Sequence, residues 1–268
     1  MFAVIRYLLK QDFKNNYFSK WYIFSEVLSI GIGLSIYWFT SKALSPHFSQ
    51  NLEWYQLNYF SYVVLGEAFL MLPLQAFNSG GRIVKGMIVD GIIDGFICIP
   101  GAIPRLINSS IFSVLVRDLI YMMLMLVSAK LFLGLNNSWA SLAVAMTLMF
   151  IFMPGFLGLG QMVAGIVIYL GRGQGLLAQA IGLISVLSGV YFPLSIFKEF
   201  KFNGLINLHP YSFYLSGVRE YLAFTKIDLS FFIYACLFAL ISLLFGHLAI
   251  KKALILLRKK GLHLFAYY

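Results

Sequence analysis

The stretch from Ser79 to Pro104, SGGRIVKGMIVDGIIDGFICIPGAIP, decides how this chain is divided, because it separates long hydrophobic segments and cannot cross a membrane itself. Its charged residues, four within thirteen positions, are Arg82, Lys85, Asp90 and Asp94. Each charge would cost about 2.5–3.5 kcal/mol at the centre of a bilayer helix, so insertion is strongly disfavoured. We therefore expect residues 79–105 to form a cytoplasmic connector.

The apolar residues of this connector need cover from a partner or from the membrane surface. They are Ile83, Val84, Met87, Ile88, Ile92, Ile93, Phe96 and Ile97. Glycines at 86, 91 and 95 weaken a helix here, and prolines at 100 and 104 end it. In a docking helix from Arg82 to Pro100, Asp90 and Asp94 would stand one turn apart to meet basic partner residues, with Phe96 filling a pocket. An ordinary loop lying flat on the membrane is the alternative.

The composition indicates an all-α polytopic membrane protein. Hydrophobic residues make up 60% of the 268 residues and charged residues only 11%, and the mean hydropathy is +0.85. The net charge of +10 does not indicate nucleic-acid binding, because the basic residues cluster at the ends of apolar segments. Cys98, Cys236 and four scattered histidines predict neither a disulfide framework nor a metal site.

The hydrophobic pattern predicts six transmembrane helices. They cover residues 21–41, 57–78, 107–131, 140–170, 174–192 and 229–250. Residues 1–20 place apolar and basic residues at helical spacing, which predicts an amphipathic helix lying on the membrane; a simple frayed tail is the alternative. No cleavable signal peptide is expected before the first span. Thirteen lysines and arginines, five of them in the basic tail 251–268, fall on one side against six on the other, so both termini are expected in the cytoplasm.

Two features inside these spans are candidates for function. Small residues form one stripe of the fifth span: Gly175, Ala178, Gly182, Ser185 and Gly189. The stripe predicts a close helix contact, either within the chain or at a subunit contact or pathway. Glu67, Arg117 and Asp118 are the most deeply placed ionisable groups; we expect Glu67 and Arg117 to pair, with substrate contact as the alternative.

The segment at 193–228 is too long for a tight turn and too aromatic for a solvated loop. Tyr211, Tyr214 and Val218 recur at helical spacing, so we expect short re-entrant half-helices that dip into the outer leaflet. An ordinary extracellular loop is the alternative.

Several functional classes lack their sequence patterns. There is no G-x-x-x-x-G-K-[ST] phosphate loop, and no nucleophile, base and orienting group cluster together. We therefore expect a chain that is not itself an enzyme and binds no cofactor, and whose energy source lies on another chain.

Two ordered patterns resemble the permease subunits of type-2 ATP-binding cassette exporters, over nearly the whole chain. The family's coupling helix carries an E-R-x-x-G-T-x-E-x-[LI]-x-x-x-P-like pattern, and similar places here are filled by Arg82, Gly86, Asp90 and Pro100. Gly81 and Met87 depart from that pattern. The second pattern, S-G-x-x-F-P-x-S…N-P…R, is similar to SGVYFPLS at 188–195, which includes Pro193, followed by His209-Pro210 and Arg219.

This resemblance implies a permease dimer, expected to be a homodimer, with a separate ATPase carrying ATP and Mg on each coupling helix. Its substrate would be an amphipathic drug, lipid or peptide; a polysaccharide or lipid-linked glycan is the alternative within the family. An ATPase-independent channel or ion-coupled carrier is the alternative from another class. That alternative predicts matched broken helices in two inverted halves, whereas we expect a break only in the fourth span, at Pro154-Gly155, without a counterpart in the first span.

Overall fold

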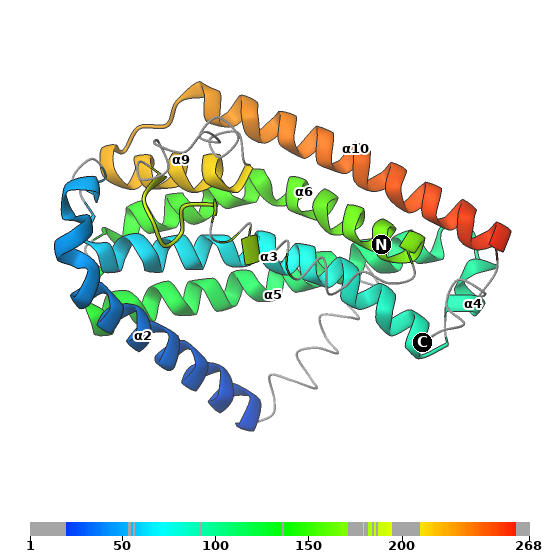
Figure 1. Cartoon of the computed structure of the whole chain (residues 1–268), viewed down its shortest axis with the longest axis horizontal. Coiled ribbons are helices and arrows are strands. Elements are labelled where there is room, and N and C mark those ends of the chain that lie inside the picture. Colours follow the sequence, from blue (N-terminus) through cyan, green and yellow to red (C-terminus); the bar gives the residue numbers. More distant parts are fainter. Residues whose placement is uncertain are drawn as a thin grey trace.

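The computed structural model describes residues 20–52, 55, 57–91, 93–135, 137–170, 179, 182–183, 185, 187–194 and 210–260, and the regular structure among them is helical (Figure 1). The helices are α2 (Lys20–Leu52), α3 (Tyr59–Val89), α4 (Ile93–Ile97), α5 (Ala102–Leu133), α6 (Trp139–Leu170), α9 (Pro210–Phe224) and α10 (Leu229–Lys260). The predicted interfacial helix at 1–20 lies outside the described residues except for Lys20, and so do nine of the nineteen residues of the predicted fifth span at 174–192.

Five of the described helices are long and apolar enough to cross a membrane, so the chain is a multi-pass membrane protein. They are α2, α3, α5, α6 and α10. Their ends differ from the predicted spans, since α3 continues to Val89 instead of ending at 78, and α5 begins at Ala102 instead of 107. Charged and polar residues mark where a segment leaves the hydrocarbon, but they do not end a helix. A helix therefore continues beyond the membrane where its residues still favour helical structure.

The core of the bundle is built on α3, which packs against α5 and α6, while α10 covers the far side of α6 (Figure 1). Large buried side chains fill these contacts, among them Phe69 on α3, Phe152 and Phe156 on α6, and Tyr214 on α9. In contrast, α2 contacts α3 and α5 lightly and diverges from the bundle toward its own N-terminus (Figure 1). The bundle therefore has a dense centre and one loosely attached helix.

Glycines bring α6 and α10 into backbone contact. A Cβ atom added to Gly158 would lie 2.5 Å from the Leu243 nitrogen, and one added to Gly165 would lie 2.7 Å from the Ala249 carbonyl carbon. Gly246 on α10 packs against the carbonyl oxygen of Gly158 in the same way. Without side chains between them the two backbones can approach closely. Gly80 on α3 and Gly160 on α6 make a second close glycine contact among the described helices.

The helix directions define two ends of the bundle. The chain runs in the same direction through α3, α6 and α10, and α5 runs in the opposite direction (Figure 1). We call the end that carries residues 89–102 the connector end; α3, α6 and α10 finish there (Figure 1). The opposite end carries α9 and is called the α9 end (Figure 1).

Candidate functional site

The connector consists of the last turns of α3, the short helix α4, and a left-handed turn at Gly91 and at Gly101. The α3 helix continues to Val89, and the amide of Asp90 closes it by donating to the Gly86 carbonyl at 2.9 Å. Gly91 has a φ of 66°, a left-handed conformation that glycine adopts without strain, and α4 follows it. The prediction of one helix from Arg82 to Pro100 is therefore wrong.

The turn at Gly91 also changes how the acidic residues are related. Asp90 follows the end of α3, whereas Asp94 lies in α4, so the two are not neighbours on one helix as predicted. Gly101, with a φ of 72°, makes a second left-handed turn just after Pro100 and before α5. Gly91, which we expected only to weaken a helix, therefore makes a left-handed turn, and Gly101 makes another.

Most of the connector's apolar side chains are covered by the chain itself, contrary to the prediction that a partner covers them. Val84, Met87 and Ile93 are buried in the main core, and four others pack partly against it: Ile83, Ile88, Phe96 and Ile97. Because α3 stays helical beyond residue 78, its buried stripe continues along the same face. Ile92 lies outside the described residues.

The surface that the connector leaves open is charged, with two apolar side chains. Val89 is 65% exposed and Ile99 is 53% exposed. Arg82, Lys85 and Asp90 are exposed beside them. The other exposed cations at the connector end, on α5 and α10, are Arg105, Lys251, Lys252, Arg258 and Lys259. Docking of an ATPase on this surface stays a prediction.

Glu67 and Arg117 have other partners than each other, so the predicted pair is wrong. The Tyr191 hydroxyl donates to the Glu67 carboxylate at 2.9 Å, and Tyr37 of α2 interacts with the same carboxylate. Arg117 Nε donates to the neighbouring carboxylate of Asp118 at 3.1 Å. At 1.5 Å per residue, Glu67 lies about 12 Å from the start of α3 and Arg117 about 24 Å from the end of α5, so the two sit at different depths.

The Arg117–Asp118 pair lines a cavity of 240 Å³ between α2, α3 and α5. Glu26 from α2, Gln75 from α3 and Tyr121 from α5 also line this cavity. Sequence analysis placed Glu26 in the first span without singling it out, because a single carboxylate near a helix end gives no signal. The cavity thus gathers more polar groups than the sequence pattern indicated.

Arg219 connects three parts of the chain at the α9 end. The side chain is 2% exposed and donates to the carbonyl oxygens of Gly189 at 2.8 Å, Tyr62 at 2.9 Å and Val190 at 3.3 Å. Its guanidinium also stacks on the Tyr62 ring, 3.5 Å from the centroid, and Tyr62 donates its hydroxyl to Gly189 at 2.7 Å. Arg219 therefore joins α9 to α3 and to the turn at 188–194.

The outer segment contains one described helix, α9, and residues 195–209 lie outside the description. Pro210 occupies the first position of α9, where a helix does not need its missing amide hydrogen. Pro193 is buried in the turn that Arg219 binds. Whether α9 dips into a membrane leaflet stays a prediction.

The expected stripe of small residues is not a tight contact within the chain at its centre. Gly182 is exposed, and a Cβ atom added there would meet no heavy atom within 4 Å. Ser185 is half-buried, and Gly189, with a φ of 77°, belongs to the turn and not to a helix. Gly175 and Ala178 lie outside the described residues. A subunit contact along this stripe stays a prediction.

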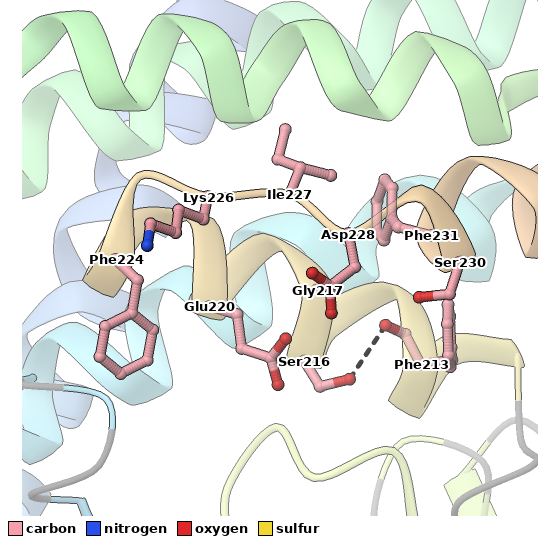
Figure 2. Close-up of a pocket in the computed structure, with 10 residues that line it drawn as sticks. All are labelled: Phe213, Ser216, Gly217, Glu220, Phe224, Lys226, Ile227, Asp228, Ser230 and Phe231. Atoms are coloured by element: carbon pink, nitrogen blue, oxygen red, sulfur yellow. Dashed lines mark hydrogen bonds between the residues drawn. The ribbon is translucent and has the colours of Figure 1, made fainter.

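A larger pocket of 690 Å³ opens between α9 and the start of α10 (Figure 2). Glu220 comes from α9, and Lys226 and Asp228 from the loop that follows (Figure 2). Burial and the nearby carboxylate of Asp228 raise the pKa of Glu220. The described residues contain no group of three His, Cys, Asp or Glu that could hold a metal ion. This pocket is therefore a mixed-charge depression with no metal-ligand set.

These observations define the class, a multi-pass helical membrane protein. Comparison of the chain with protein-family models and with curated proteins finds no match. The functional assignment therefore depends on the arrangement of the chain's own residues.

Proposed function

We propose that this chain is the membrane-spanning subunit of an ATP-driven exporter, energised by a separate ATPase that docks at the connector end. The substrate would be an amphipathic drug, lipid or peptide, and a polysaccharide or lipid-linked glycan is the alternative cargo. Two permeases, expected to be identical, would enclose the pathway, with two ATPases supplying ATP and Mg.

The observation that carries the proposal is the depth at which lysine and arginine first occur on α3 and α10. At 1.5 Å per residue, Arg82 lies about 35 Å from the start of α3 and Lys251 about 33 Å from the start of α10. Each is the first lysine or arginine along its helix. The hydrocarbon core is about 30 Å thick, so these residues fall just beyond it if the α9 end marks its other face.

The connector end therefore protrudes from the membrane. The helices α3, α5, α6 and α10 have 31 or 32 residues. They are about 46–48 Å long, which is about 16–18 Å more than the hydrocarbon needs. Positive charge gathered on one side favours the cytoplasm. A structured, charged end at that side is a surface on which a soluble ATPase can dock.

The second family-like pattern adds support from the other end. Ser188 to Pro193 and Arg219 are separated in sequence, yet Arg219 binds the Gly189 and Val190 carbonyls directly. Residues that must contact one another in the fold are expected to appear together, in a fixed order, in the sequence pattern of a family. The contact gives the pattern a physical reason, and it supports placing the chain near exporter permeases.

A reconstitution experiment tests the proposal. The chain is placed in liposomes alone, or with the ATPase encoded beside its gene, and efflux of a fluorescent amphipathic dye is followed. We expect transport only when the ATPase, ATP and Mg are all present. Robust transport by the chain alone would refute the proposal and favour the channel or ion-coupled carrier.

Cross-linking tests the docking surface separately. In a background with Cys98 and Cys236 changed to serine, Val89→Cys places an exposed thiol on the connector. Met87→Cys, two residues away and 2% exposed, is the matched control. We expect the thiol at 89 to cross-link to the ATPase and the thiol at 87 to remain unlinked. Equal labelling of both, or of neither, would count against this docking surface.

A further inference from the structure

The cavity between α2, α3 and α5 contains a carboxylate oxygen whose hydrogen-bonding capacity is not met. The Asp118 side chain is 7% exposed, and its Oδ1 accepts from Arg117. Its Oδ2 is buried and has no hydrogen-bond partner within the described part of the chain. A buried ionised oxygen without a partner is unfavourable, and in a membrane no bulk water is at hand to satisfy it. This oxygen is a candidate acceptor for a ligand.

The charge of the cavity lining favours a cation. Glu26 and Asp118 contribute two carboxylates and Arg117 one guanidinium, which already donates to Asp118. Glu26 also acts electrostatically on Asp118 and Tyr121, so the second carboxylate is close to the first. Arg82 also acts electrostatically on Asp118, with a larger effect than Glu26, but it is not among the described residues that line the cavity. The described residues that line the cavity carry one excess negative charge.

The size and position of the cavity indicate which part of a ligand fits. Its 240 Å³ is smaller than the roughly 300–1,000 Å³ of pockets that enclose a whole drug-sized ligand. Met71, Ile120 and Leu124 line it beside the polar groups. Its lining residue Glu26 lies on α2, which diverges from the bundle (Figure 1), and Val27 and Leu28, next in sequence, are exposed. A polar head can therefore enter while its apolar chain lies along α2.

We propose that this cavity binds the ammonium head of an amphipathic amine, which donates a hydrogen bond to Asp118 Oδ2 and is balanced by Glu26. Gln75 and Tyr121 provide further polar contacts around the head. The inference rests on the proposed export function, for which it names the substrate class. An ammonium group fits better than a sulfate or phosphate, because an anion would face both carboxylates.

Binding of radiolabelled decylamine to the full-length chain in nanodiscs tests this inference, with empty nanodiscs measured to subtract partitioning into lipid. We expect saturable binding that excess unlabelled decylamine displaces and that decanol and decyl sulfate do not. Asp118→Asn should weaken binding by about tenfold or more, since a charge-assisted hydrogen bond is lost. Glu26→Gln should weaken it in the same direction.

The variants also separate binding from folding. Asp118→Asn leaves Arg117 without its carboxylate and can unfold the chain, whereas Glu26 is half-buried on the loosely packed α2 and its change is milder. Glu220→Gln, which removes a carboxylate outside the cavity, should bind decylamine as the unmodified chain does. Non-saturable binding, displacement by decyl sulfate, or unchanged binding by folded Glu26→Gln would overturn the inference.

The assay contains no ATPase, so its failure is distinct from failure of the export proposal. Saturable decylamine binding with no cross-link from residue 89 would overturn ATPase docking alone. A cross-link without saturable binding would overturn the amine site alone.

Discussion

Replacing Arg219 by methionine should destabilise the α9 end measurably. The guanidinium makes two hydrogen bonds of normal length, 2.8 and 2.9 Å, and a longer one of 3.3 Å, all to buried carbonyl oxygens. Hydrogen bonds from a charged donor contribute about 1.5–3 kcal/mol each, so the two short ones amount to about 3–6 kcal/mol. Methionine preserves much of the side-chain length and removes all of these donors.

Part of this loss is offset, because methionine does not have to be stripped of water as the guanidinium does. We expect a net loss of about 3 kcal/mol in the free energy of unfolding, between full loss and full compensation. At about 2–4 °C per kcal/mol for a chain of this size, the melting temperature should fall by roughly 6–12 °C. The melting temperature of Arg219→Lys should lie between those of the unmodified chain and Arg219→Met, since one ammonium group cannot both stack on Tyr62 and reach three carbonyl oxygens.

The assay is fluorescence-detected size-exclusion chromatography after heating the detergent-solubilised protein. Lys226→Met is the matched control, because it removes an exposed cation from the same segment and should leave the melting temperature unchanged. A melting temperature for Arg219→Met within about 2 °C of the unmodified chain would refute the reasoning, since it would correspond to less than about 1 kcal/mol.

Two further predictions concern the helix contacts. Gly158→Leu should sharply lower the yield of folded protein, because its Cβ would lie 2.5 Å from the Leu243 nitrogen. Gly182→Leu is the control and should preserve the yield, because a Cβ atom there meets no heavy atom within 4 Å. Equal yields of the two variants would be inconsistent with the glycine contact. Glu67→Gln and Tyr191→Phe should each lower the free energy of unfolding by about 1–2 kcal/mol, and the double variant by no more than either, as a double-mutant cycle of thermal unfolding would show.

Much of the helical architecture was predictable, because hydrophobic segments near the length of a membrane span are a strong signal. Five described helices overlap predicted spans, and the connector does lie between α3 and α5. The helix ends were not predictable from hydropathy, since Arg82 and Lys85 mark where hydrocarbon ends but not where helical hydrogen bonding ends. That same difference hid the burial of Val84 and Met87.

The polar contacts were harder to predict, because they join residues far apart in sequence. Arg219 was identified from an ordered pattern, but its carbonyl partners include Tyr62, 157 residues away. Glu67 was correctly singled out as a polar group inside a span, yet its partner is the hydroxyl of Tyr191 and not Arg117. Spacing identifies which groups need partners, whereas tertiary structure decides which partners they receive.

The backbone contact between α6 and α10 limits how this molecule can move. Sliding α10 along α6 by about one turn would bring a residue three or four positions from Gly246, such as Leu243 or Ile250, against the Gly158 carbonyl that now faces glycine. The two helices must therefore travel together as a rigid block. A rearrangement that admits or releases cargo must therefore involve other helices. The loosely packed α2 can move relative to the bundle without disrupting a glycine-mediated backbone contact.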